Sequence, residues 1–229
     1  MNEKNSIFSL AYWKSAALEL KRPKMLVLAS VLIALRVAIK SWAIPIGENL
    51  FIYFGFFVNA LGGMCFGPVV AAVAAAISDT LGCLIAPKGV YFFPFIFVEI
   101  AGSVIFALFL YKRRISEIRV ILSRFCVCVG VNLILNPLIM IWYYEVMFDK
   151  SYTFFTLPRT VKNLVLFPAE SLLLILFLNA LIPALSRFKL IVHQEKMKIS
   201  VKNVLFLLAL LVVAILVVYF YYTKFLVNI

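Results

Sequence analysis

Long apolar runs separated by short polar segments repeat along the whole chain of 229 residues. A helix needs about 20 apolar residues to cross the hydrocarbon core of a bilayer, and most of these runs are of that order. We therefore predict spanning helices over the following segments: 25–46, 50–66, 68–86, 91–112, 120–147, 159–186 and 202–222. The second and third segments meet at Gly67-Pro68, a join so tight that the two helices must be antiparallel neighbours.

This pattern predicts an all-α, polytopic membrane helical bundle, because helices satisfy every backbone hydrogen bond within one segment. The basic stretch 187–201 separates a six-helix body from one last helix. We accordingly divide the chain into a basic N-terminal segment (1–24), a six-helix substrate-binding membrane domain (25–186), a basic linker (187–201) and a C-terminal part with an additional transmembrane helix (202–229).

Composition and charge agree with a membrane protein. Hydrophobic residues make up 65% of the chain, which excludes an ordinary soluble globule. The net charge of +12 comes from basic residues gathered in short segments between the apolar runs, where anionic lipid accounts for them better than nucleic acid does. Three of these segments, around 14–24, 112–119 and 187–202, fall on one side of the bilayer if every run crosses once. That side is expected to be cytoplasmic, with the N-terminus inside and the C-terminus outside the cell membrane.

Asp79 lies within one of the most apolar stretches, GPVVAAVAAAISDTLG. A carboxylate is costly in hydrocarbon, so it needs a partner, a cavity or a function. Small residues share its helical face, which predicts that Asp79 points into the bundle. An alternative is a structural carboxylate satisfied by backbone groups or by a basic side chain.

The first spanning segment carries a stripe of small residues, Ser30, Ala34 and Ala38. Such a stripe allows another helix to approach closely, either within this chain or in a partner protein. Arg36 lies on the opposite side of the same helix. If the stripe faces a partner, Arg36 therefore faces the interior of this protein.

Polar residues of other segments fall in the outer half of the bundle in the predicted orientation. Arg159, Lys162 and Asn163 share one helical face that continues toward Glu170. Asn136 and Glu99 lie in neighbouring segments, and the aromatic residues Phe54 and Phe93 fall nearby in the sequence pattern. This distribution predicts a pocket that opens outside and suits a planar, polar solute.

The sequence lacks several catalytic patterns. It contains no GxxxxGK[ST] phosphate loop, so the chain is not expected to hydrolyse ATP. Its single histidine, His193, lies in the basic linker, which excludes metalloprotease and histidine-dependent serine sites. The four cysteines show no metal-ligand spacing. We expect a binding or transport protein without metal or cofactor, and not an enzyme.

These residues resemble the substrate-binding S components of energy-coupling factor (ECF) vitamin transporters, and among them the folate-specific type. The resemblance covers residues 25–186. It rests on the following motifs: Ala34-Leu35-Arg36, FGFFVNALGGMCFGPVVAAVAAAISDTLG, the P-x-G-x-x-F-F-P run from Pro87 to Pro94, and RTVKNLVLFPAE. FGP followed by Asp is specific for the superfamily only, whereas Arg36 together with RTVKN favours folate. Asn59 stands where the family often has proline, Glu99 is unexpected, and the seventh helix is additional.

The resemblance implies a protein that captures folate or a related pterin from outside. It then docks on a transmembrane scaffold with two ATPase subunits through Ser30, Ala34 and Ala38. A pterin ring offers an amide-and-amino edge that Asn136, Glu170 or Asp79 can bind, and a face for Phe54 or Phe93. Arg36 fits the ring carbonyl, and Arg159 and Lys162 fit the carboxylates of the glutamate tail. Alternatives are an S component for another vitamin or nucleobase-like solute, and a stand-alone secondary carrier.

Overall fold

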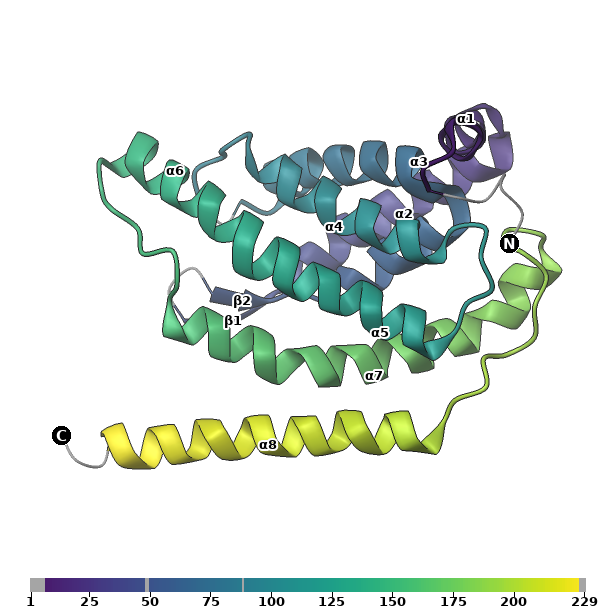
Figure 1. The fold of residues 1–229 in the computed structure, drawn as a ribbon. Helices are drawn as coiled ribbons and strands as arrows, with labels where there is room; N and C mark the ends of the chain where they lie inside the picture. The colour runs from purple at the N-terminus through teal and green to yellow at the C-terminus, as the bar shows by residue number, and fades with distance from the viewer. Residues whose placement is uncertain (1–6, 48–49, 88, 227–229) are drawn as a thin grey trace. The chain divides into compact units, whose positions relative to one another are not determined.

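The computed structural model describes residues 7–47, 50–87 and 89–226. Almost all elements are helical (Figure 1). In chain order they are α1 (Leu10–Leu18), a 3₁₀ turn (Glu19–Lys21), α2 (Pro23–Ser41), β1 (Ile44–Gly47), β2 (Leu50–Ile52), α3 (Phe56–Ile85), α4 (Phe95–Leu110), α5 (Glu117–Cys126), a π-helical stretch (Val127–Leu135), α6 (Asn136–Phe148), α7 (Leu157–Arg187) and α8 (Val201–Leu226). The all-α fold class is therefore confirmed.

The chain divides into two compact units. The first unit comprises residues 1–115 and 180–196, and the second comprises residues 116–179 and 197–229. Helix α7 contributes to both units. Each unit contains its own group of buried polar side chains.

Helix α3 is two helical halves joined at Gly67, as the Gly67-Pro68 pair predicts. Gly67 has φ 77° and ψ −178°, values that break the helix and that only glycine adopts readily. The first half begins at Phe56 and not at 50. The break gives each half its own direction, so that residues of both halves line one cavity described below.

A short antiparallel hairpin stands in place of the predicted end of the first spanning helix and the predicted start of the second. Ile44 pairs with Ile52, and Pro45 pairs with Phe51. The predicted helix to 46 is wrong at this end because α2 ends at Ser41. Pro45 has no backbone donor and restricts the residue before it to extended conformations, which favours a strand here.

Close packing joins α3 to α4. A Cβ added at Gly63 would lie 2.8 Å from the backbone nitrogen of Ala107, so the two helices approach closely only because residue 63 has no side chain. The buried face of α4 includes Gly102, Ser103 and Phe106. This contact fixes the position relative to α3 of Ser103 and of Glu99, which lies about one helical turn before Ser103.

The N-terminal segment contains a helix, α1, that the hydrophobic pattern did not predict. Tyr12 of α1 is buried, and its hydroxyl donates a hydrogen bond to the carbonyl oxygen of Ala107 at 3.4 Å. Burial raises the pKa of Tyr12 to about 12. The Tyr111 hydroxyl donates to the buried carboxylate of Glu19 at 3.0 Å. These contacts attach α1 and the following turn to the end of α4.

Three helices within the described residues are long and apolar enough to cross a membrane: Phe56–Ile85, Glu117–Phe148 and Leu157–Arg187. Phe95–Leu110 and Val201–Val217 are shorter apolar helices. Helix α2 has 19 residues but carries Lys24, Arg36 and Lys40. The apolar segments of the sequence pattern therefore recur as helices, with shorter bounds for α2 and α4.

The linker 188–200 contains no helix, and side chains hold it at defined points. In the first unit, Gln194 accepts a hydrogen bond from the Ile115 backbone N–H at 2.7 Å. In the second unit, Glu117 accepts from the Ser200 N–H at 2.9 Å and from Nδ2 of Asn203 at 2.6 Å. Glu117 thereby satisfies a backbone donor at the start of α8.

Candidate functional site

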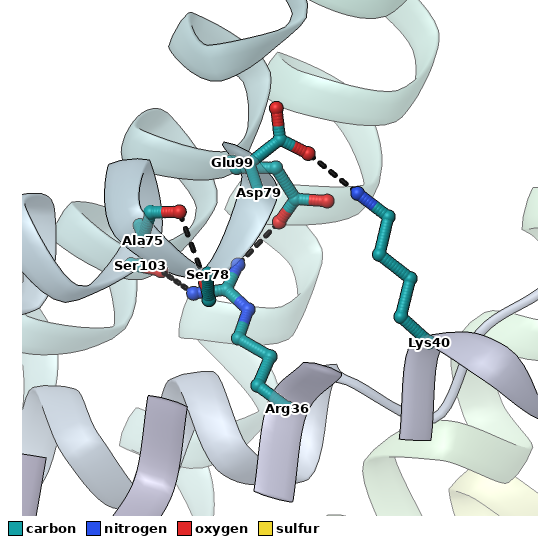
Figure 2. Close-up of polar contacts among 7 residues, drawn as sticks. All are labelled: Arg36, Lys40, Ala75, Ser78, Asp79, Glu99 and Ser103. Atoms are coloured by element: carbon teal, nitrogen blue, oxygen red, sulfur yellow. Dashed lines mark hydrogen bonds and ion pairs between the residues drawn. The ribbon is translucent and has the colours of Figure 1, made fainter. Parts of the chain in front are cut away.

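Two cations of α2 form the centre of a polar group in the first unit. Arg36 and Lys40 are four residues apart, so they project from the same face of the helix. Arg36 pairs with Glu99 of α4, and the Lys40 ammonium lies 2.6 Å from a carboxylate oxygen of Asp79 of α3. Figure 2 shows both side chains reaching from α2 toward the two carboxylates. We call these four residues the first-unit cluster.

The first-unit cluster is electrically balanced, because two cations meet two carboxylates. Asp79 is 7% exposed and Arg36 donates a further hydrogen bond to Oγ of Ser103 at 3.3 Å. Lys40 supplies the basic partner that the sequence analysis left open for Asp79. The pairing offsets the cost of placing charge within an apolar bundle.

A small cavity adjoins this cluster. Its polar lining consists of Arg36, Asn59 and Ser103. The rest of the wall is apolar and comes from α2 and from both halves of α3: Leu32, Ile33, Val58, Gly62, Gly63, Phe66, Ala71 and Ala74. An apolar cavity with few polar groups is typical of a small-molecule site.

The second unit contains a more deeply buried ion pair. Arg124 of α5 donates to the carboxylate of Glu170 of α7, and these side chains are 6% and 10% exposed. Lys162 lies within electrostatic range of Glu170, Arg159 and Arg124. We call Arg124, Arg159, Lys162 and Glu170 the second-unit cluster. It contains three cations and one carboxylate, so it has an excess of two positive charges.

Arg159 is the cation of this cluster that is best placed to bind an anion. Its residue is 7% exposed, and Nη1 is buried without a hydrogen-bond partner among the described residues. The guanidinium lies over the ring of Tyr152, 5.4 Å from the centroid, and Tyr152 stacks on Tyr144 at 4.9 Å. This cation–π contact orients the guanidinium while it leaves donors unused.

Asn163 lies on the same helix as Arg159 and Lys162, but its side chain bonds to neighbouring protein groups. Its Nδ2 donates to the Arg159 carbonyl oxygen at 2.9 Å, and its Oδ1 accepts from Nδ2 of Asn132 at 2.9 Å. The Cys128 thiol also contacts the Asn163 carbonyl oxygen. Asn163 thus connects α7 to the π-helical stretch, a kind of irregularity that is frequent at functional sites.

The remaining predicted contacts lie outside the two clusters. Asn136 is partly buried at the start of α6, Phe54 precedes α3, and Phe93 precedes α4 and is 59% exposed. Neither phenylalanine lines the cavity, whose aromatic residue is Phe66. The stripe formed by Ser30, Ala34 and Ala38 is exposed on α2. Among the described residues, no neighbouring helix therefore covers these three residues.

Sequence reasoning missed Lys40, Arg124 and Tyr152 as members of these groups. A signal existed for Lys40, because it is four residues after Arg36 and shares its face. Arg124 falls inside a predicted spanning segment, which is itself a reason to expect a buried partner. Tyr152 lies in a loop and gave no signal. Among the described residues, no group of three His, Cys, Asp or Glu side chains is arranged to hold a metal ion.

Comparison with known proteins gives concordant matches. The sequence model of the family described as "ECF transporter, substrate-specific component" matches residues 24–178. A folate transporter FolT of Clostridium novyi (strain NT) is 36% identical over 121 residues, which cover 53% of this chain and 68% of that protein. A folate transporter FolT of Leuconostoc mesenteroides subsp. mesenteroides is 29% identical over 150 residues, 64% of this chain and 80% of that protein.

A solved structure is also similar. It is described as "Crystal structure of FolT bound with folic acid", and it matches with a TM-score of 0.59 and 32% sequence identity over 66% of this chain and 89% of that one. The family match ends at residue 178, so the linker and α8 lie outside it.

Proposed function

Because the chain belongs to the family of ECF transporter substrate-specific components, we propose that it binds folate or a closely related pterin. The relatives named folate transporters and the similar structure with bound folic acid support this substrate. A substrate-specific component binds and does not convert its substrate, so we do not expect an enzyme.

The difference in charge between the two clusters is the observation that carries the proposal. Folate combines an uncharged pterin ring, which has hydrogen-bonding edges, with a glutamate tail that has two carboxylates. The first-unit cluster is balanced and adjoins a cavity, which suits an uncharged ring. The second-unit cluster has an excess of two positive charges, which suits a dianion.

In the first unit, we assign the pterin ring to the cavity beside Arg36. The cavity is small, and its largely apolar wall with a few polar groups suits one ring of folate and not the whole molecule. Arg36 has five N–H donors and keeps some for a ring carbonyl while it pairs with Glu99. Asp79 holds Lys40, and Phe54 and Phe93 remain proposed contacts to the face of the ring, although they do not line the cavity.

In the second unit, we assign the tail carboxylates to Arg159 and Lys162. Arg159 has a buried, unused donor, and Lys162 belongs to the same cationic group. Glu170 orients Arg124, and Asn163 fixes the first turn of this part of α7 through its bonds to Arg159 and Asn132. Asn136 remains a proposed contact to the polar edge of the substrate.

Delivery across the cell membrane requires energy that this chain does not supply. We assign that role to a transmembrane scaffold with two ATPase subunits, on which the substrate-loaded protein docks. The exposed stripe formed by Ser30, Ala34 and Ala38 offers the docking surface, because small residues let another helix approach closely. The N-terminus is then cytoplasmic, and the substrate enters from outside.

A binding experiment on purified protein tests the substrate. Arg36→Glu and Arg159→Glu should each lower folate affinity by about a hundredfold or more. Arg36→Glu removes the donor to the ring carbonyl, and Arg159→Glu replaces a required cation with a charge that repels the tail carboxylates. Arg187→Glu, at an exposed position at the end of α7, is the matched control and should bind as the wild type does. Calorimetry and native mass spectrometry measure the affinity. Wild-type affinity in both site variants would contradict the assignment, and binding of another vitamin in place of folate would favour a different specificity.

An uptake experiment tests the docking surface. Ala34→Trp should retain folate binding in purified protein but abolish uptake in cells that express the scaffold and ATPase subunits. Val73→Trp introduces the same side chain at an exposed position of α3 and should leave uptake intact. Uptake by the wild type in cells without ATPase partners would indicate a stand-alone carrier.

A further inference from the structure

Asn59 is the polar residue of the cavity whose hydrogen bonding is incomplete. It lies in the first half of α3, and its side chain lines the cavity together with Arg36 and Ser103. Its Oδ1 is buried and has no hydrogen-bond partner among the described residues. Arg36 and Ser103, in contrast, bond to each other, and Arg36 also pairs with Glu99.

Apart from Arg36 and Ser103, neither of which bonds to Asn59, the wall of the cavity has no side-chain donor. The neighbours Gly62 and Gly63 have no side chains, and the remaining lining residues are apolar. Backbone N–H groups in helices are already used by the preceding turn. A buried amide oxygen without a donor is unfavourable, so native structures rarely retain one unless something else supplies the donor.

Other asparagines in the described structure form side-chain hydrogen bonds within the protein. Asn163 uses both its amide oxygen and its amide nitrogen in bonds within the second unit. Asn203 donates to Glu117, and Asn179 accepts from the Met197 N–H. Asn59 lacks such a bond at its oxygen, although that atom is buried and the residue lines the cavity.

We infer that Asn59 is a specificity-determining residue that reads the hydrogen-bonding edge of the substrate ring. Its amide presents an acceptor beside a donor, the arrangement complementary to an edge on which an amino group or ring N–H adjoins an acceptor. The inferred ligand group is therefore an amino-substituted heteroaromatic edge. This inference rests on the proposed function, because it assumes that the ring occupies this cavity.

A ligand comparison distinguishes a direct contact from a structural effect. We would measure the affinities of wild type and Asn59→Leu for folate and for a folate analogue in which hydrogen replaces the amino group of the pterin ring. The wild type should bind the analogue about tenfold or more weakly, the effect of one buried hydrogen bond. Asn59→Leu should lose a similar factor for folate and bind both ligands with nearly equal affinity.

The controls address folding and general polarity. Thr80→Val removes a polar group from α3 whose hydroxyl bonds within its own helix, and it should retain the discrimination of the wild type. Asn59→Ala provides a second variant, should leucine prevent folding. The ligand-free Asn59→Leu protein should melt at a temperature equal to or above that of the wild type, because an unpaired buried acceptor is removed.

The outcomes separate this inference from the proposed function. Wild-type protein that binds no folate would overturn both. Folate binding by the wild type, with unchanged affinity and discrimination in Asn59→Leu and Asn59→Ala, would overturn only the role of Asn59. A lower melting temperature of ligand-free Asn59→Leu, with discrimination retained, would also overturn it, since the amide would then be structural.

Discussion

Gly67 allows a strong test of how the bundle is built, because its backbone and its surroundings both exclude a side chain. Its φ of 77° with ψ of −178° falls in a region that is almost restricted to glycine. A Cβ at this position would lie 2.8–2.9 Å from three ring atoms of Tyr111. Gly67→Ala should therefore destabilise the first unit through two independent effects.

The structure allows both effects to be estimated. Backbone strain at such a φ and ψ costs about 1–3 kcal/mol, and overpacking in a filled site costs about 1–3 kcal/mol. The Tyr111 ring cannot simply move away, because it is 2% exposed, donates to Glu19 and packs edge-on against Tyr12 with centroids 5.7 Å apart. The free energy of unfolding should fall by about 2–6 kcal/mol, which lowers Tm by at least about 4 °C in a chain of this size.

Thermal unfolding in detergent, followed by circular dichroism, measures the effect. Gly102→Ala is the control, because the added methyl group meets no atom within 4 Å and lies within α4; it should equal or exceed wild-type stability. In a double-mutant cycle, Tyr111→Leu should relieve the clash at residue 67 but not the backbone strain. If Gly67→Ala and Gly102→Ala have the same melting temperature, the account of the α3 break is wrong.

Three further predictions concern the second unit and the linker. Glu170→Gln should lower the free energy of unfolding by about 3–5 kcal/mol, because it leaves Arg124 buried without a carboxylate. Replacement of both residues by Met should lower that free energy much less, and thermal unfolding measures the difference. Glu117→Ala should accelerate proteolysis of the linker because α8 loses its contacts with that carboxylate, and the exposed Glu145→Ala should not. A chain that ends at Lys198 should bind folate within about twofold of the full chain, because α8 lies outside the family match. A large loss of affinity would assign α8 a part in binding.

Hydrophobic pattern and local backbone chemistry predicted most of the fold. The Gly67-Pro68 pair marked the break in α3 because these residues restrict the backbone by themselves. The pattern failed at 44–52, where apolar residues continue but Pro45 and the short spacing produce a hairpin. It also missed α1, because the helix is stabilised by tertiary contacts of Tyr12 and not by a long apolar run.

The candidate site was less predictable because it depends on pairing between helices. The sequence identifies Arg36, Asp79 and Glu99 as charges within apolar segments, but not which cation meets which carboxylate. That choice requires the α2–α3 and α3–α4 contacts, which glycines such as Gly63 make close. The incomplete bonding of Asn59 was also inaccessible, since it depends on which partners Arg36 and Ser103 take in the folded chain.

Charge pairing also explains why Glu99, unexpected in the family resemblance, is compatible with folate as substrate. Without Glu99, Arg36 would add an unpaired positive charge beside the cavity, and a dianion would compete with an uncharged ring for that cluster. With Glu99, the first-unit cluster is balanced, whereas Arg124, Arg159 and Lys162 outnumber Glu170 in the second unit. In the proposed function, the balanced cluster is assigned to the ring, so Glu99 would act on specificity because it prevents an anion from binding at Arg36.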